Sequence, residues 1–229
     1  MKLAIMQPYF FPYLGYFQLI HAVDTFVVYD DVNFIKGGWI NRNYILSHGQ
    51  KVRITLQLLG ASPNRLINQI SVAENRGKLL RTLQQNYARA PYLADVLPML
   101  EEILGFEESN LAVFLDLGLR RICDYLNICP RWCRSSNLQK DNSLRGQDKI
   151  LAICKELGAK HYINVPGGKI LYDHASFTAA DIRLSFIEPR VLEYRQSGHE
   201  FVPYLSIIDI LMFNNQQQCQ RLLERYKLV

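Results

Sequence analysis

The sequence lacks the paired cysteine motifs of structural metal sites. Its five cysteines include no C-x-x-C pair, and Cys129 and Cys133 have no second pair of ligands at zinc-site spacing. The number of cysteines is odd, which disfavours a closed disulfide framework and fits a reducing compartment. We therefore predict no metal site.

Long apolar segments are also absent. No window of about 18 residues is apolar enough for a membrane-spanning helix. The apolar run near the start of the chain is too short for the apolar core of a signal peptide. These absences favour a cytoplasmic protein without a membrane span.

Three motifs of large enzyme classes do not occur. The chain has no GxxxxGK[ST] loop of the P-loop proteins, no GxGxxG of NAD-binding Rossmann domains and no GxSxG nucleophile elbow. The sequence therefore gives little support to nucleophilic catalysis by serine or to NAD chemistry.

Charge of either sign is modest. The 229 residues carry 26 Lys and Arg against 21 Asp and Glu, a net charge of +5, and 49% of the residues are hydrophobic. The basic residues form only small clusters, at 51–53, 120–121 and 131–134. A pocket for a phosphate-bearing small molecule needs less charge than a nucleic-acid surface. The length and composition fit one large domain over residues 1–229.

The start of the chain predicts a βαβ unit. Residues 2–6 form a short apolar run that ends at Gln7-Pro8, and an amphipathic helix is expected from Pro12. The β-branched and aromatic run "DTFVVYDDV" predicts the next buried strand. Two strands joined in this way are expected to be parallel, with a right-handed crossover.

The remaining segments complete an α/β pattern. Residues 33–58 predict a hairpin with a turn at "HGQ", and three helices are expected within a helical insertion or cap over about 76–128. A helix over 143–159 capped by Ser143, the strands "KHYINV" and "IRLSFIE", and two closing helices follow. We therefore predict a Rossmann-like parallel sheet with a β-hairpin excursion and a helical insertion.

The first strand-to-helix turn is the first candidate site. Ligands of open parallel sheets bind at the carboxyl ends of the strands, where the N–H groups of the next helix are free. Gly15 would let a phosphate approach the first turn of this helix, and the tyrosine rings would hold a base or a sugar. The alternative is that the rings only pack the helix onto the sheet. The candidate binding residues in this turn are Gln7, Tyr9, Tyr13, Gly15 and Tyr16.

The stretch "DDVNFIKGGWINRN" is the second candidate site. Asp30 ends a predicted strand and is a candidate to position or deprotonate an acceptor, whereas Asp31 is more readily explained as a turn residue. Arg42 is suited to bidentate contact with a phosphate or carboxylate. The other candidate binding residues here are Lys36, Trp39, Asn41 and Asn43.

Two further segments carry weaker signals. Gly167, Gly168 and Lys169 follow a predicted strand and could cradle a phosphate, although a simple tight turn explains them better. His199, in a polar loop, is the histidine best suited to acid–base catalysis. Ser206 is expected to cap the helix after it, with Asp209 in the capping-box position.

Two resemblances follow from these motifs. "PYLGY", residues 12–16, has the spacing of the P-H-x-G-H signature of nucleotidylyltransferases and pantothenate synthetases, which have Rossmann-like folds. Tyr13 and Tyr16 replace both histidines, so this resemblance supports the fold more than the chemistry.

The second resemblance covers nearly the whole chain. "QPYFFPYLGYFQLI", "DTFVVYDDVNF", "WINRN", "YARAPY", "ELGAKHYI" and "FVPYLSIIDIL" occur in an order that resembles the WbqC-like family. This resemblance implies a bacterial protein of surface-polysaccharide (O-antigen, lipopolysaccharide) synthesis, with a role in transferring glycine or another amino acid to a sugar. It implies no catalytic residues.

Together these features favour a transferase that uses a nucleotide-linked or phosphorylated donor and a sugar acceptor. Asp30, Arg42 and His199 are its candidate catalytic residues. The first alternative is a non-catalytic module that binds a nucleotide or small molecule in the same pathway, favoured by the loss of both signature histidines. The second alternative, an RNA binder, rests only on the basic charge and the aromatic residues, and it ranks last.

Overall fold

A computed structural model describes residues 1–190, 193–197 and 200–229. Within these residues, six strands form the central sheet in the order β10-β9-β8-β1-β2-β7. All neighbours pair in parallel except β9 and β10, which are antiparallel. The strands are β1 (Lys2–Met6), β2 (Thr25–Val28), β7 (Arg131–Arg134), β8 (His161–Asn164), β9 (Arg183–Pro189) and β10 (Tyr226–Leu228). The structure confirms the predicted α/β fold with a mostly parallel sheet.

The βαβ unit predicted at the start of the chain is present. Helix α1 (Leu14–His21) joins β1 to β2, and Leu3 pairs with Thr25 in a parallel register. All four residues of β2 are buried, as expected of a strand covered on both faces.

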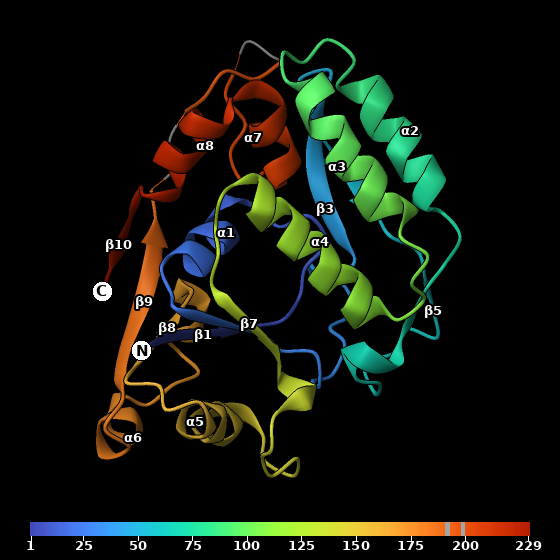
Figure 1. The fold of residues 1–229 in the computed structure, drawn as a ribbon. Coiled ribbons are helices and arrows are strands. Elements are labelled where there is room, and N and C mark those ends of the chain that lie inside the picture. The colour runs from blue at the N-terminus through green and yellow to red at the C-terminus, as the bar shows by residue number, and fades with distance from the viewer. Residues whose placement is uncertain (191–192, 198–199) are drawn as a thin grey trace.

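Helices cover both faces of the sheet. Phe26 and Val28 of β2 face the larger core, which contains buried residues of α1, α4 (Leu111–Tyr125), α7 (Ile207–Phe213) and α8 (Gln216–Leu223). Val27 faces the smaller core, under α5 (Gly146–Glu156) and α6 (His174–Ala179). The alternation of side chains along a strand explains this division. Figure 1 shows α5 and α6 on one side of the strands, and α1, α4, α7 and α8 on the opposite side.

Between β2 and its neighbour β7 the chain makes a long excursion. It contains the predicted hairpin, in which His48 and Gly49 both have positive φ values between β3 (Arg42–Ser47) and β4 (Gln50–Thr55). Two positive φ values in a two-residue loop match the twist of a β-hairpin. The excursion also contains β5 (Leu58–Leu59), a 3-10 turn (Ile67–Gln69), β6 (Ser71–Val72), α2 (Arg76–Asn86) and α3 (Leu93–Gly105).

The helical segment shares its core with the sheet. Leu83 of α2, Leu100 of α3 and Leu119 of α4 are buried in the same cluster of side chains as Phe26 of β2. Helix α4 also contacts the sheet directly, because the guanidinium of Arg120 lies over the ring of Trp132 in β7.

Several local predictions were wrong. The segment 131–134, for which no element was predicted, forms the edge strand β7, and the chain after α8 forms β10 instead of continuing as a helix. Helix α5 begins at Gly146, because Ser143 bonds to the carboxylate of Asp141 and does not cap a helix. The short helix α6 was not predicted. Each of these segments is too short for a periodic pattern to identify it.

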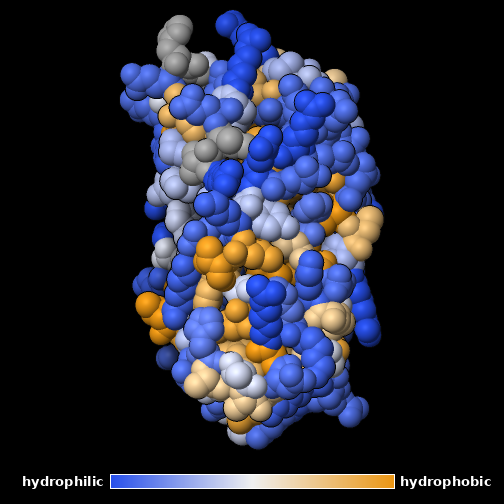
Figure 2. Space-filling model, turned by 90° about the vertical axis from the view of Figure 1, so that its left-hand side faces the viewer, coloured by the Kyte–Doolittle hydropathy of each residue, from blue (hydrophilic) through white to orange (hydrophobic). Residues whose placement is uncertain are grey.

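The side of the molecule with β9, β10 and α6 is shown in Figure 2. Hydrophilic residues dominate its upper part, and apolar residues gather in its middle and lower parts. Among the described residues, none of the helices has the length and apolar character needed to cross a membrane.

Candidate functional site

The candidate site lies at the carboxyl edge of the parallel strands. Strand β1 has β2 on one side and β8 on the other, so the direction of the strand order reverses beside β1. This reversal is the topological switch point, where open α/β sheets bind ligands. Two pockets open among the segments that follow these strands, and they share no lining residue.

The first, here named the aromatic pocket, has a volume of about 580 Å³. It is bounded by the β1–α1 turn, the segment before β3, the residues after β8, the end of β9 and the residues before α7. Its lining residues are Tyr9, Pro12, Tyr13, Trp39, Asn43, Pro166, Glu188, Pro189 and Tyr204.

The β1–α1 turn is held by buried rings. Phe10 and Phe11 are only 2% and 3% exposed, and Phe11 has a φ of 44°, an uncommon value for a residue with a side chain. The side chains of Asn43 and Ser206 donate hydrogen bonds of 2.6 and 2.8 Å to the carbonyl of Phe11. These two bonds hold the turn in its unusual conformation and leave Tyr9 and Tyr13 to face the pocket.

Gly15 packs against a ring and leaves no approach for a phosphate. A Cβ at this position would lie 2.4 Å from Cε2 of Tyr13 and 2.8 Å from Cγ of Pro189. The ring of Tyr13 therefore fills the space over the first turn of α1. The geometry corrects the expectation that a phosphate approaches here.

Gln7 and Tyr16 support the turn from beneath. The Tyr16 hydroxyl donates a 2.7 Å hydrogen bond to the carbonyl of Gln7, and the residue is 1% exposed. Because this hydroxyl is already paired, it is not a free donor for a ligand. The Tyr16 ring also packs against Tyr9 and Phe26.

The tyrosines of the aromatic pocket are neutral at physiological pH. Burial, and then the neighbouring Tyr13, raises the pKa of Tyr9. Burial, and then Tyr204, raises the pKa of Tyr13. Both side chains therefore offer hydroxyl groups and ring faces, and neither supplies the positive charge of a histidine.

The hairpin candidates separate into two groups. Trp39, 48% exposed, and Asn43 line the aromatic pocket. Arg42 instead donates from Nε to the carbonyl of Gly38 at 2.9 Å, and Asn41 donates to the carbonyl of Leu56. Lys36 is exposed. None of these last three lines either pocket.

The glycine segment after β8 lies at the rim of the aromatic pocket. Gly168 packs closely on the amide of Asn164, where a Cβ would approach Nδ2 to 2.9 Å, while Gly167 lies in the same 3-10 turn. Lys169 pairs with Glu188 at 2.8 Å, and its hydrogen bond lowers the pKa of that carboxyl. The segment thus supplies an ion pair at the rim. His199 lies outside the described residues.

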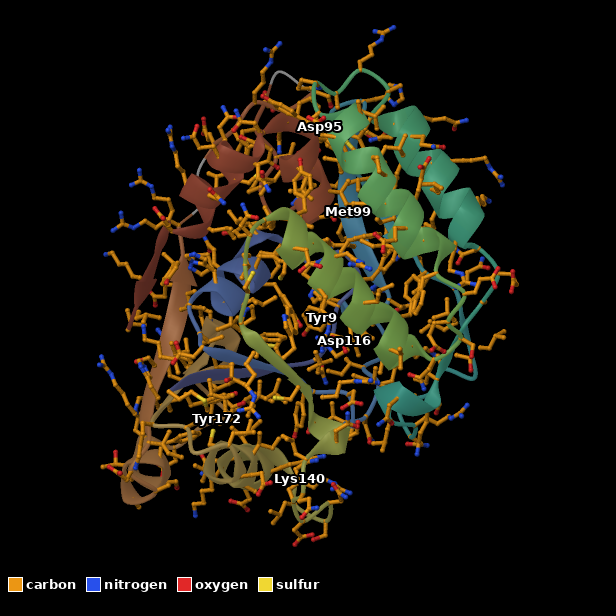
Figure 3. All side chains as sticks on the ribbon, viewed as in Figure 1. Tyr9, Asp95, Met99, Asp116, Lys140 and Tyr172 are labelled. Atoms are coloured by element: carbon orange, nitrogen blue, oxygen red, sulfur yellow. The ribbon has the colours of Figure 1, made fainter. Side chains whose placement is uncertain are left out.

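The second pocket, here named the basic pocket, has a volume of about 540 Å³. It opens between the residues that follow β2 and β7 and the start of α5. Its lining residues are Tyr29, Asp31, Val32, Asn33, Leu66, Asn68, Gln69, Ser136, Asn142, Arg145, Gly146 and Lys149. Figure 3 shows Lys140, from the loop before α5, well apart from Tyr9 of the aromatic pocket.

Asp30 is buried beside the basic pocket, and both its carboxylate oxygens are used. Oδ1 accepts from the backbone N–H of Ser136 at 2.9 Å, and Oδ2 accepts from the Ser136 hydroxyl at 2.6 Å. The amide of Asn68 lies 3.4 Å from Oδ2. Asp30 thus ties the segment after β7 to β2, which is a structural use of the residue predicted to act on an acceptor.

Asp31 lies between two buried ammonium groups. Its Oδ2 is 2.8 Å from Nζ of Lys140 and 3.1 Å from Nζ of Lys149, and the two lysine side chains are 1% and 3% exposed. Burial alone would raise the pKa of Asp31, but the side chains of Lys140, Ser135 and Lys149 outweigh it and lower the pKa. Lys149 also donates to the carbonyl of Asp31 and lies 5.3 Å from the ring centre of Tyr29.

The sequence interpretation missed Lys140, Arg145 and Lys149. They are single basic residues after a strand that was not predicted, and no motif connects them with Asp31. One signal was available: Lys149 precedes Ile150 and lies one turn before Ile153, on the apolar stripe of α5, where an ammonium group needs a partner.

Another buried carboxylate lies in the first turn of α7. Asp209, fully buried, accepts hydrogen bonds from Tyr87 at 3.0 Å, Tyr194 at 2.8 Å and Gln196 at 3.1 Å. Burial raises the pKa of Asp209 despite these bonds. Ser206 caps α7 as predicted, through the N–H of Ile208, but Asp209 joins this network instead of a capping box.

With this geometry in view, the comparisons with known proteins place the chain in a family. The model of the WbqC-like protein family matches residues 7–221. The chain belongs to the WbqC-like family. It is also 29% identical, over 92% of both chains, to an uncharacterized protein of Mycobacterium tuberculosis. No solved structure matches the chain.

The match with the family extends over both pockets. It begins at Gln7, directly after β1, and ends within α8, so the aromatic and basic pockets lie inside it. The fold and the expected family are therefore established together, while the chemistry has to be argued from the pockets themselves.

Proposed function

We propose that the protein is a group transferase of surface-polysaccharide synthesis. It would carry an amino acid or acyl group from an activated, nucleotide-linked donor to a sugar. The observation that carries this proposal is the aromatic pocket at the switch point of a Rossmann-like sheet. Membership of the WbqC-like family provides the setting.

The pocket is built to hold a flat or hydroxyl-bearing ring. Trp39, Tyr9 and Tyr13 offer ring faces, and stacking of a base on such a face is worth about 1–3 kcal/mol. The hydroxyls of Tyr9 and Tyr13, which are protonated at neutral pH, can donate hydrogen bonds to a sugar or a base. The pocket volume of about 580 Å³ is sufficient for a ligand of this size.

Glu188 is the carboxylate of this pocket. It pairs with Lys169 and its pKa is lowered, so it is charged at neutral pH and accepts hydrogen bonds from a hydroxyl or an ammonium group. A carboxylate in this position can orient the acceptor of the transferred group. It takes the positioning role that the sequence analysis assigned to Asp30.

A specific observation favours a second function, a non-catalytic ring-binding module. The tyrosines that replace the signature histidines bring no positive charge, and the lowered pKa of Glu188 makes it a weak base. A pocket with ring faces and neutral hydroxyls can bind a ligand without supplying a group that catalyses its reaction. Transfer activity decides between the two functions.

Binding is tested through the fluorescence of Trp39. The chain has two tryptophans, so the Trp132→Phe variant reports on Trp39 alone. UDP-glucose, UMP, glucose and a glycyl-sulfamoyl adenosine are the probes. We expect at least one nucleotide probe to quench the emission saturably, and Trp39→Ala to weaken its binding about tenfold in calorimetry.

Val52→Ala is the matched control, because Val52 is exposed on the same hairpin and does not line the pocket. Binding that is unaffected by Trp39→Ala, or lost equally in Val52→Ala, contradicts the assignment of the pocket. Transfer is tested separately, by mass spectrometry of UDP-glucosamine incubated with glycyl adenylate and the protein. Saturable binding without a glycylated product leaves the ring-binding module as the function.

A further inference from the structure

The proposed function uses the aromatic pocket and gives the basic pocket no role. Its lining residues differ from those of the aromatic pocket, and its volume of about 540 Å³ is similar. A fold that only needed an ion pair between β2 and α5 would not require an open cavity over it. The charges and donors around this cavity indicate what it can hold.

Two buried ammonium groups share one carboxylate in the floor of the pocket. Lys140 and Lys149 both contact Oδ2 of Asp31, and the nearby Asp30 is engaged by Ser136 and Asn68. Buried charges need partners, and the two aspartates balance the charge of the two buried lysines. Of the residues that line the pocket itself, Asp31 is negative and Arg145 and Lys149 are positive, so the lining has a net positive charge.

Asp31 is itself incompletely paired. Within the described part of the chain, its Oδ1 is buried and has no hydrogen-bond partner, although the side chain is 91% buried and lines the pocket. A carboxylate oxygen in this state needs a donor. The hydroxyl of Ser135, also buried and without a partner in the described residues, is a neighbouring donor that lowers the pKa of Asp31. A hydroxyl group of a bound molecule would supply a further one.

The start of α5 adds donors for an anion. Arg145 and Gly146 line the pocket, and the N-cap Arg145 offers no side-chain acceptor to the first N–H groups of the helix. Nη1 of Arg145 donates to the carbonyls of Asn142 and Leu144 at 2.6 and 2.8 Å, so Nε and Nη2 are the guanidinium donors that a ligand would use. Gly146 has a φ of 51°, and a Cβ there would meet nothing within 4 Å, so the backbone at this point is open. Free N–H groups and the helix dipole together favour a phosphate. Asp148, in the same turn, is exposed and does not line the pocket.

We propose that the basic pocket is a binding site for the phosphate group of a hydroxyl-bearing small molecule, such as a sugar phosphate. Lys149, the guanidinium of Arg145 and the first N–H groups of α5 hold the phosphate. Lys140 and Asp31 fix the position of Lys149. The phosphate is therefore expected at the start of α5 and not at the start of α1, where Tyr13 closes the approach. It adds to the proposed function but is tested without it.

Binding of inorganic phosphate and of glucose 1-phosphate to the full chain, measured by isothermal calorimetry at physiological salt, tests this site. Glucose is the uncharged control ligand. We expect saturable binding of both phosphates and none of glucose. Arg145→Ala and Lys149→Met are each expected to raise the Kd at least tenfold.

Lys155→Met is the matched control variant. It removes the same charge from the same helix, but Lys155 is exposed in the last turn of α5 and should leave the Kd within twofold of the wild type. Equal weakening by Lys155→Met would indicate diffuse charge attraction and overturn the site, as would a wild type that binds neither phosphate. Arg145 is exposed, so Arg145→Ala is expected to fold normally. This variant keeps the test valid if Lys149→Met does not fold.

The outcome is independent of the transferase proposal. Phosphate binding that is lost in Arg145→Ala supports the basic pocket even if no group is transferred. Conversely, transfer that is unchanged in Arg145→Ala, with no phosphate binding, removes this site and leaves the proposed function intact.

Discussion

The aromatic pocket and the basic pocket lie at the same edge of one sheet, but different forces hold them together. Rings packed around the β1–α1 turn form the aromatic pocket. Among the described residues, the only ion pair at this pocket joins Lys169 to Glu188, and it lies half exposed at the rim. Charges buried to 91% or more form the second, where Asp31 joins β2 to α5. The contributions of neutral packing contacts to stability are short-range and add together, whereas the stability of a buried charge depends on every one of its partners.

This difference predicts different responses to mutation. Removing one ring from the aromatic pocket should affect the ligand more than the fold, because Trp39 is half exposed. Removing one of the buried charges of the basic pocket should affect the fold first, since the remaining buried charges lose a partner.

The largest expected effect is that of Asp31→Asn. The substitution leaves two buried ammonium groups without a carboxylate and should lower the free energy of unfolding by about 3 kcal/mol. Urea denaturation measures it. Asp181→Asn breaks the exposed pair with Lys160 and should leave the midpoint unchanged. Equal midpoints for the two variants would show that the Asp31 cluster is not a structural charge centre.

A smaller effect is expected at Gly15, which packs against Tyr13 and Pro189 of the aromatic pocket. Gly15→Ala would force a Cβ against the Tyr13 ring and Pro189, and should lower the free energy of unfolding by about 1–3 kcal/mol. In Gly77→Ala the new Cβ meets nothing within 4 Å and lies inside α2, so this control should raise stability by about 0.5–1 kcal/mol. If thermal unfolding shows the two alanines to be alike, the ring does not close the turn.

The smallest expected effect is on the pH dependence of stability, to which Asp31 and Asp209 contribute with opposite signs. The pKa of Asp31 is lowered from 3.8, so its stabilisation is complete above that value and is lost as pH falls through the folded pKa. The pKa of Asp209 is raised, so its contribution is greatest at low pH and declines as pH rises between 3.8 and the folded pKa. Burial and hydrogen bonds oppose each other at both sites, which keeps the net effects small.

Urea unfolding between pH 7 and pH 3 measures both. The stability difference between wild type and Asp31→Asn should shrink as the pH falls, and the difference between wild type and Asp209→Asn should grow. Parallel changes in the two variants would contradict the assigned environments.

The features predicted correctly were those carried by local patterns. Apolar runs and the turn residues around them identified β1, α1, β2 and the β3–β4 hairpin, because each is a complete element within one short stretch. Of the candidate residues, Tyr9, Tyr13, Trp39 and Asn43 do meet in one pocket. Arg42 does not join them, because its guanidinium is bonded to the carbonyl of Gly38, only four residues away.

The sequence by itself determined the α/β class, the family and the aromatic character of the first turn, since short-range pattern and composition specify these. Only the tertiary structure decided that Asp31, Lys140 and Lys149 form one charged cluster and that Tyr13 closes the start of α1. Contacts between residues more than a hundred positions apart, such as Asp31 with Lys149, leave no mark in local sequence. They arise because β2 and β7 are neighbours in the sheet and deliver their carboxyl ends to the same place.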